Sequence, residues 1–376
     1  MHKRGQIAYT PVSTFESEST TMAAADGSYG DMKETLKTVV GVSSPLPLVP
    51  CMKVDSFVNA QGLKVVTYAF DPSADAEFGA AKLKGVVILL HGYGAHTQYQ
   101  WFHAKTSGEC RTSYEDTTID NLVKQGYACR TLDHQGGGRS EGVGSMRGNY
   151  LFENLVEEAE QYISEVVMNE PHLKNLPAFL FGISMGGATA IRLSENNPDR
   201  YTGMVTFAPM ISLEKVRQAQ VFHCIKNKHL EPFIGLLACL APTMAIAKSS
   251  PNTMFPMMQL EYENDPMCYH EDTRVIVAKS FIDITARFMG PRGFDNVTVP
   301  FATFHSVHDT LTDIEGTEAL FTRSSNVRNM DKKFFKVGEG LDVGVKMWHN
   351  LIAEPGRDLV FAAALSWMDE RCVVKK

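Results

Sequence analysis

Apolar and polar residues alternate along two neighbouring segments, residues 52–59 and 63–70, around the turn sequence Asn-Ala-Gln-Gly. A period of two is typical of strands with one buried face, so we expect an antiparallel pair. Four later runs are mainly apolar, as buried strands are: residues 85–90, 127–133, 178–181 and 203–208. Helix-like segments lie between them at residues 117–125, 152–169 and 185–196. Strands that alternate with helices predict an α/β fold with a mainly parallel sheet and helices on both faces.

The alternation lapses between residues 211 and 299, where apolar, Met-rich and Pro-rich sequence holds no clear strand. Strand-like runs return at residues 300–305 and 333–337, and residues 359–371 predict an amphipathic closing helix. We therefore expect residues 211–299 to be inserted late in one α/β domain that spans residues 51–376. Methionine fills irregular apolar surfaces, which suits the adaptable wall of a binding site, but a second small core explains the same composition.

Composition and charge narrow the classes of function. The chain has 376 residues, of which 44% are hydrophobic and 21% charged, as in ordinary globular proteins. Its 36 Lys and Arg face 43 Asp and Glu, so it has no basic surplus with which to bind a nucleic acid. Residues 1–50 are rich in Ser, Thr and Gly, and we expect a mobile tail with one short helix near residues 31–40.

The seven scattered cysteines form no CxxC motif, and the basic start of the chain lacks the apolar stretch of a secretory signal. Both features favour a reducing, cytoplasmic location. The longest apolar stretch, residues 233–247, contains Pro242 and is shorter than the roughly 20 residues that a membrane-spanning helix needs. Together with Lys228 and Lys248 it would suit docking on a membrane surface, and a buried helix of the insert fits equally well.

The most informative motif is Gly-Ile-Ser-Met-Gly, centred on Ser184, between the apolar run 178–181 and the helix-like segment 185–196. A serine hydroxyl must stand clear of the backbone to act as a nucleophile, and a sharp strand-to-helix turn with small neighbours allows this. The sequence Gly-Arg-Ser-Glu-Gly around Ser140 has the same spacing but follows three glycines rather than a strand. We interpret Ser184 as the nucleophile and the Ser140 segment as a loop.

A second turn follows the strand at residues 85–90 and reads His91-Gly92-Tyr93-Gly94. By itself this could be an ordinary turn, because glycine favours turns. With Ser184 downstream, we expect the backbone N–H groups of Tyr93 and Met185 to form an oxyanion hole.

A serine of this strand-turn-helix kind is followed along the chain first by its acid and then by its histidine. Six histidines follow Ser184, and His349 lies in a loop between the last strand and the closing helix, where a base can project from the sheet edge. His223 and His229 flank basic residues of the insert and are expected at its surface or lining it. For the acid we choose Asp309, the first aspartate beyond the strand 300–305. Asp313 is the alternative, and could instead cap the following helix.

His305, His308 and Asp309 could also suggest metal ligands, but no HExxH or paired CxxC motif supports a metal site. No phosphate-binding Gly-rich motif follows a strand, so we expect neither a catalytic metal nor a nucleotide cofactor.

With these residues in place, the chain resembles the monoacylglycerol lipase and lysophospholipase family of α/β-hydrolases, which includes plant caffeoyl shikimate esterase. The resemblance covers about residues 54–371 and rests on the blocks VVILLHGYGAH, RTLDHQGGGRSEG, FLFGISMGGATAIRL, HDTLTD and MWHNLIAEPG. It implies an α/β-hydrolase fold with a mainly parallel eight-stranded sheet and a helical cap at residues 211–299. It also implies Ser184, Asp309 and His349 as a catalytic triad, and acyl esters of glycerol as substrates.

Three departures from the family pattern stand out: the extra N-terminal tail, the bulk of Tyr93, and a long span between residues 333–337 and His349. The cap is weakly matched, so three hypotheses stay open: a hydrolase of monoacylglycerols or lysophospholipids, an esterase for small or aromatic acyl esters, and a non-catalytic binding protein. Under the first, apolar side chains of the insert would line the acyl site and face a membrane or micelle; they include Phe233, Ile234, Leu236, Leu237, Leu240, Met244, Ile246, Met254, Phe255, Met257 and Met258.

Overall fold

The computed structural model describes residues 46–372, apart from residues 48, 73–82, 219, 223–224, 227–228, 230 and 248–249. The expected short helix near residues 31–40, and the expected tail up to residue 45, lie outside the described residues.

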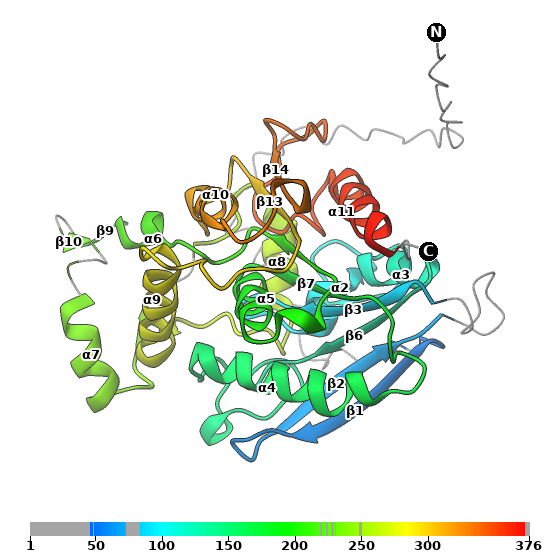
Figure 1. Cartoon of the computed structure of the whole chain (residues 1–376). Helices are drawn as coiled ribbons and strands as arrows, with labels where there is room; N and C mark the ends of the chain where they lie inside the picture. The colour runs from blue at the N-terminus through cyan, green and yellow to red at the C-terminus, as the bar shows by residue number, and fades with distance from the viewer. Residues whose placement is uncertain are drawn as a thin grey trace, which may run out of the picture. The chain divides into compact units, whose positions relative to one another are not determined.

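Eight strands form one sheet in the order β1-β2-β6-β3-β7-β8-β13-β14 (Figure 1). The strands β1 and β2 pair antiparallel, as expected, and β2 pairs antiparallel with β6. All further neighbours are parallel. The bounds are β1 Met52–Val58, β2 Lys64–Phe70, β3 Gly85–Leu90, β6 Tyr127–Leu132, β7 Ala178–Ile183, β8 Gly203–Phe207, β13 Phe301–Ser306 and β14 Lys332–Val337. The expected mainly parallel sheet is confirmed.

Helices cover both faces of this sheet because its central strands are apolar on both sides. In β3, Val86 and Ile88 belong to one core cluster, with α4 and α5, whereas Val87 and Leu89 belong to a second one, with α3 and α11. The helices of the α/β core are α2 Thr97–Trp101, α3 Thr118–Lys124, α4 Phe152–Glu165, α5 Met185–Asn196, α10 Ile314–Arg323 and α11 Arg357–Cys372. One-turn 3-10 helices follow α4 and α5, at Val167–Asn169 and Pro198–Arg200.

The segment between β8 and β13 contains four helices and four very short strands among its described residues. The helices are α6 Glu214–Gln218, α7 Glu231–Leu240, α8 Pro256–Asn264 and α9 Val275–Met289. The strands pair as two ribbons, β9 Gln220–Phe222 with β10 Ile225–Lys226 and β11 Ala245–Ala247 with β12 Thr273–Arg274. A third ribbon, β4 His103–Ala104 with β5 Arg111–Ser113, lies in the core. None of these ribbons was predicted.

The helix α9 attaches this segment to the core. It packs against α4, and its residues Val277, Phe281 and Ile284 join the same buried cluster as α4 and α5. The backbone N–H of Phe152 at the start of α4 donates to Ser280 Oγ (3.2 Å). Helix α7 contacts α9 on its far side from α4, as Figure 1 shows, so α7 is the outer layer here. No helix among the described residues is long and apolar enough to cross a bilayer.

Candidate active site

Ser184 occupies the sharp turn between β7 and α5. Its backbone has φ 53° and ψ −117°, a left-handed conformation that a non-glycine residue adopts only when its surroundings enforce it. Its N–H donates to Phe207 O (2.9 Å), and its carbonyl accepts from Met210 N (2.9 Å). A Cβ added at Gly182 would collide with Gly186 O, and one added at Gly186 with Leu90 O, so both glycines are required by close backbone approach.

The turn His91-Gly92-Tyr93-Gly94 lies next to this serine: a Cβ built on Gly92 would be 3.6 Å from Ser184 Cβ. The backbone N–H groups of Tyr93 and Met185 make no hydrogen bond with any described residue. Two such free donors beside a serine hydroxyl could bind a developing oxyanion.

The side chain of His91 fixes the direction of the Tyr93 N–H. His134 N donates to His91 Nε2 (3.0 Å), so Nδ1 carries the proton and donates to Gly92 O (2.8 Å). Burial, together with the neighbouring His134, lowers the pKa of His91 to about 3, so this tautomer is neutral. In a trans peptide the carbonyl and the next N–H point in opposite directions. By holding Gly92 O on one side, His91 directs the Tyr93 N–H to the other.

Asp309, in the loop after β13, contacts His349, in the loop after β14. His349 Nδ1 donates to Asp309 Oδ2 (2.7 Å), which leaves Nε2 available to act as a base. Asp309 Oδ1 also accepts from Leu311 N (2.7 Å) and Thr312 N (3.1 Å), and Oδ2 accepts from Thr312 Oγ1 (3.0 Å). His305 Nε2 lies 3.3 Å from the same Oδ2.

These contacts set the charges of the pair. Burial alone would raise the pKa of Asp309, but His349 and the bond from His305 hold it well below its usual range. Burial alone would lower the pKa of His349, but the charge and hydrogen bond of Asp309 raise it above its usual value. The carboxylate therefore stays ionised and stabilises a protonated imidazole.

Glu354 holds the loop that carries His349. Its fully buried carboxylate accepts the backbone N–H groups of Trp348 (2.6 Å), His349 (3.0 Å) and Asn350 (2.7 Å). Although these bonds favour the ionised form, burial raises the pKa of Glu354. Sequence reasoning assigned Glu354 no role, and its position five residues after His349 in the conspicuous MWHNLIAEPG block was the available signal.

Two connections bring the serine region and the Asp309–His349 pair to the same edge. The end of β8 bonds to both, because Met210 N donates to Ser184 O while Ala208 O accepts from Thr312 Oγ1 (3.1 Å). Gln100 makes the second connection: its Oε1 accepts from Gly92 N (3.4 Å) and its Nε2 donates to Asn350 Oδ1 (3.1 Å).

No hydrogen bond joins Ser184 Oγ to His349 within the described residues. Such bonds often tighten only when substrate is bound.

Asp313 has different partners. Its buried carboxylate accepts from Ser212 Oγ (2.7 Å), from Glu214 N and from Lys215 N (3.2 Å), so it caps the first turn of α6. It stands at the N-cap position of α10 but makes no side-chain bond to that helix. The capping role expected for Asp313 is therefore found, on a different helix.

The other sequence candidates lie apart from this arrangement. Ser140 Oγ donates to Asp133 O (2.5 Å) and accepts from Val66 N (2.8 Å), in a loop followed by the single 3-10 turn Val143–Ser145. His229 is exposed, and His223 is outside the described residues. His305 bonds Thr317 Oγ1 (2.7 Å) through Nδ1 and supports Asp309.

Two clusters of the described chain could hold a metal ion, and neither includes Asp309 or His349. In the first, Asp71, Glu170 and His172, the guanidinium of Arg130 already bonds both carboxylates. In the second, His96, Asp265 and Cys268, all three residues are buried.

Comparison with known proteins gives consistent matches. Residues 81–355 match the family Hydrolase_4, described as serine aminopeptidase, S33. The caffeoylshikimate esterase of Arabidopsis thaliana is 27% identical over 85% of this chain and 86% of its own length. The monoglyceride lipase of Homo sapiens is 25% identical, over 78% of this chain and 84% of its own length.

Among solved structures, a soluble variant of the monoglyceride lipase from Saccharomyces cerevisiae, in complex with a substrate analogue, superposes with a TM-score of 0.65 at 19% identity. The match covers 87% of this chain and 98% of that one. This likeness confirms the expected fold.

Proposed function

The chain belongs to the Hydrolase_4 family of serine hydrolases with the α/β-hydrolase fold, and on that premise we propose that it cleaves monoacylglycerols or lysophospholipids. That it is an enzyme for carboxylic esters follows from the family and its named members. The observation that carries the proposed mechanism is the buried 2.7 Å bond between His349 Nδ1 and Asp309 Oδ2.

In the proposed mechanism, Ser184 Oγ attacks the ester carbonyl carbon while His349 Nε2 takes its proton. The N–H groups of Tyr93 and Met185 stabilise the negative oxygen of the tetrahedral intermediate. The C–O bond then breaks, and His349 returns the proton to the leaving alcohol, which leaves an acyl-serine. Water, deprotonated by His349, releases the fatty acid and restores Ser184.

The lipid substrate class is supported by the outer helix α7. Phe233, Leu236 and Leu240 are 61%, 61% and 74% exposed, and they recur at the spacing of one helix face. Ile234 is buried, so that side chain belongs to the packing of α7 rather than to its outer surface. A single apolar helix face exposed to solvent suits contact with a membrane or micelle. Residues 211–299 would then form a cap that meets the lipid surface.

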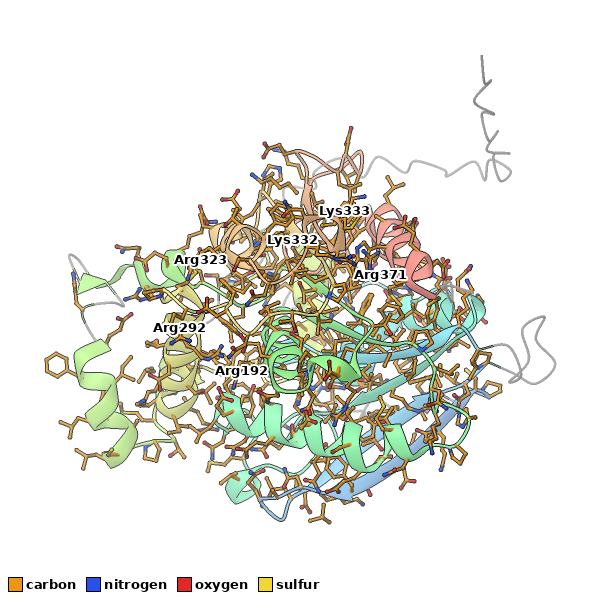
Figure 2. The ribbon with its side chains drawn as sticks, in the orientation of Figure 1. Arg192, Arg292, Arg323, Lys332, Lys333 and Arg371 are labelled. Atoms are coloured by element: carbon orange, nitrogen blue, oxygen red, sulfur yellow. The ribbon has the colours of Figure 1, made fainter. Side chains whose placement is uncertain are left out.

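The contact we propose is apolar rather than electrostatic. The sequence of α7, EPFIGLLACL, contains no basic residue. Lys228 and Lys248, which were expected to suit docking together with this stretch, lie outside the described residues. The basic side chains labelled in Figure 2 belong to other elements: Arg192 to α5, Arg292 to the turn after α9, Arg323 to α10, Lys332 and Lys333 to β14, and Arg371 to α11.

We place the enzyme in a reducing compartment, since the cysteines of the described residues are free thiols.

One observation favours the second candidate, an esterase for aromatic acyl groups. The ring of Tyr93 packs edge-to-face against Tyr150, Tyr269 and Phe281 at centroid distances of 6.4, 6.1 and 5.3 Å. This aromatic wall beside the oxyanion turn would also suit a planar acyl group.

Hydrolysis of glycerol monoesters of increasing chain length separates the two candidates. With a lipid substrate, kcat/KM rises from butyrate to about C12, by up to roughly fourfold for each methylene that leaves water. A flat or falling profile, with aromatic esters preferred, would support the second candidate instead.

Labelling with a fluorophosphonate probe tests the nucleophile. Ser184→Ala abolishes labelling and lowers kcat by on the order of 10⁴-fold or more, because it removes the hydroxyl that attacks the ester and the probe. Ser140→Ala is the matched control and keeps both. Labelling that persists in Ser184→Ala, or no labelling of the wild-type chain, would refute the proposed mechanism and favour a binding protein.

A further inference from the structure

A second group of chemically reactive side chains lies outside the arrangement around Ser184. His96 precedes α2, whereas Asp265 and Cys268 follow α8, and all three are buried. One ligand atom from each, an imidazole nitrogen, a carboxylate oxygen and a thiol sulfur, lies within 4.8 Å of the other two.

Three polar atoms of this cluster lack hydrogen-bond partners among the described residues. Both ring nitrogens of His96 and Oδ2 of Asp265 are fully buried and make no hydrogen bond with a described residue. His96 Nε2 lies 3.2 Å from that Oδ2, which is an ion-pair contact. Unpaired buried polar atoms are rare in folded proteins, because each one gives up its water without compensation.

The local backbone directs two of these groups toward the histidine. Asp265 Oδ1 accepts from Met267 N (2.9 Å), and Asp265 O accepts from Cys268 N (3.2 Å). This turn occupies one carboxylate oxygen and leaves Oδ2 directed at His96. Cys268 forms a small buried cluster with Ala95 and Tyr99, and Tyr262 packs against it.

We propose that His96, Asp265 and Cys268 bind a zinc ion that joins the turn before α2 to the segment after α8. A mixed nitrogen, sulfur and oxygen ligand set is typical of Zn²⁺. Ligand atoms about 2.0–2.3 Å from a tetrahedral centre lie about 3.3–3.8 Å from one another, so the observed spacing needs only a small contraction. The ion would be a partner for Asp265 Oδ2 and for one of the two ring nitrogens of His96.

The zinc ion would fix a junction that the protein already builds with weaker contacts. Tyr269 N donates to Gly94 O (2.8 Å), and Arg147 Nη1 donates to Met267 O (3.0 Å). Gly94 directly follows Tyr93, whose N–H we assign to the oxyanion hole. Zinc would therefore hold the segment after α8 against the turn that carries this donor.

A second cysteine lies in the same region, outside the three-residue cluster. Cys110 Sγ donates to Asn264 O (3.2 Å), one residue before Asp265.

The test measures zinc directly, without an activity readout. The full chain is kept reduced with a phosphine, stripped with a chelator, and titrated with Zn²⁺ alone. We expect one tightly bound zinc per chain by atomic emission and, at a free zinc concentration about 100-fold above Kd, a rise in Tm of roughly 3–6 °C. Co²⁺ in its place should show a thiolate charge-transfer band.

Cys268→Ser loses the bound zinc, the rise in Tm and the cobalt band, and Asp265→Asn weakens binding at least about tenfold. Cys239→Ser, which removes an exposed thiol of α7, is the matched control and keeps all three. The zinc-free Tm and the circular dichroism of each variant verify its fold. Equal zinc binding by the wild-type chain and Cys268→Ser would overturn the proposal, as would a wild-type cobalt complex without the band.

Discussion

At the residue scale, the aspartates 309 and 313 lie four positions apart and serve different partners. Asp309 bonds His349, whereas Asp313 caps α6. Asp309→Asn should lower kcat by about 10⁴-fold, because the imidazole loses the carboxylate that orients it and stabilises its protonated form. Asp313→Asn should leave kcat unchanged and cost about 1 kcal/mol of unfolding free energy. Steady-state kinetics and thermal unfolding of both folded variants check this, and the reverse order in kcat would make Asp313 the acid.

The pH dependence of activity follows from the raised pKa of His349. A general base works when neutral, so kcat/KM should fall as pH decreases through a pKa above the ordinary histidine value of about 6.5. Asp309→Asn removes the charge that raises this pKa, and the acid limb of its residual activity should move to lower pH. Profiles between about pH 5 and about pH 9 test this. An acid limb that stays in place would show that another group titrates.

The same two pKa shifts make the stability of the fold depend on pH, in opposite directions. The bond raises the pKa of His349, so its stabilising contribution is complete below about pH 6.5 and is lost as pH rises through the folded-state value. The lowered pKa of Asp309 acts the other way: its contribution is complete above about pH 4 and is lost as pH falls. The pair therefore stabilises the fold most between these two values.

At the element scale, α7 offers a matched comparison. Leu236 is 61% exposed on α7, and Leu359 is 52% exposed on α11. Leu236→Asp should weaken binding to phosphatidylcholine vesicles and hydrolysis of a long-chain monoacylglycerol within them by roughly tenfold, because one apolar side chain no longer enters the lipid. Hydrolysis of a soluble butyrate ester should not change.

Leu359→Asp, the control, should leave both activities and vesicle binding at wild-type levels. If both leucine variants lose vesicle activity equally, or if neither does, then α7 is not the lipid contact. Flotation of the protein with vesicles reports binding separately from turnover.

At the scale of the whole molecule, the α/β core could be predicted from sequence because each of its strands and helices shows a pattern within its own stretch of residues. The run GVVILL coincides with β3, and the helix expected at residues 185–196 coincides with α5. Each has a continuous pattern within its own stretch of the chain. The ribbons β9–β10 and β11–β12 have strands of two or three residues, which are too short to show a period.

Some residues of the candidate site could likewise be predicted from sequence, and others could not. Ser184, Asp309 and His349 could be chosen from motif and chain order, and the contact between the last two is present, while their catalytic roles remain predictions. Glu354, His305 and Gln100 could not be assigned, because what they do depends on side-chain contacts that no local pattern reveals. The cluster at His96 joins residues about 170 positions apart, and sequence spacing gave no sign of it.

The strand order also has a consequence for the time at which the enzyme first becomes active during synthesis. The proposed nucleophile, Ser184, follows β7 in the middle of the sheet. The proposed acid and base, Asp309 and His349, follow β13 and β14 at its edge, and these two strands leave the ribosome last. At ordinary elongation rates, His349 emerges on the order of ten seconds or more after Ser184. A nascent chain can thus display its serine turn without being able to use it, and ester hydrolysis begins only when the final two strands have joined the sheet.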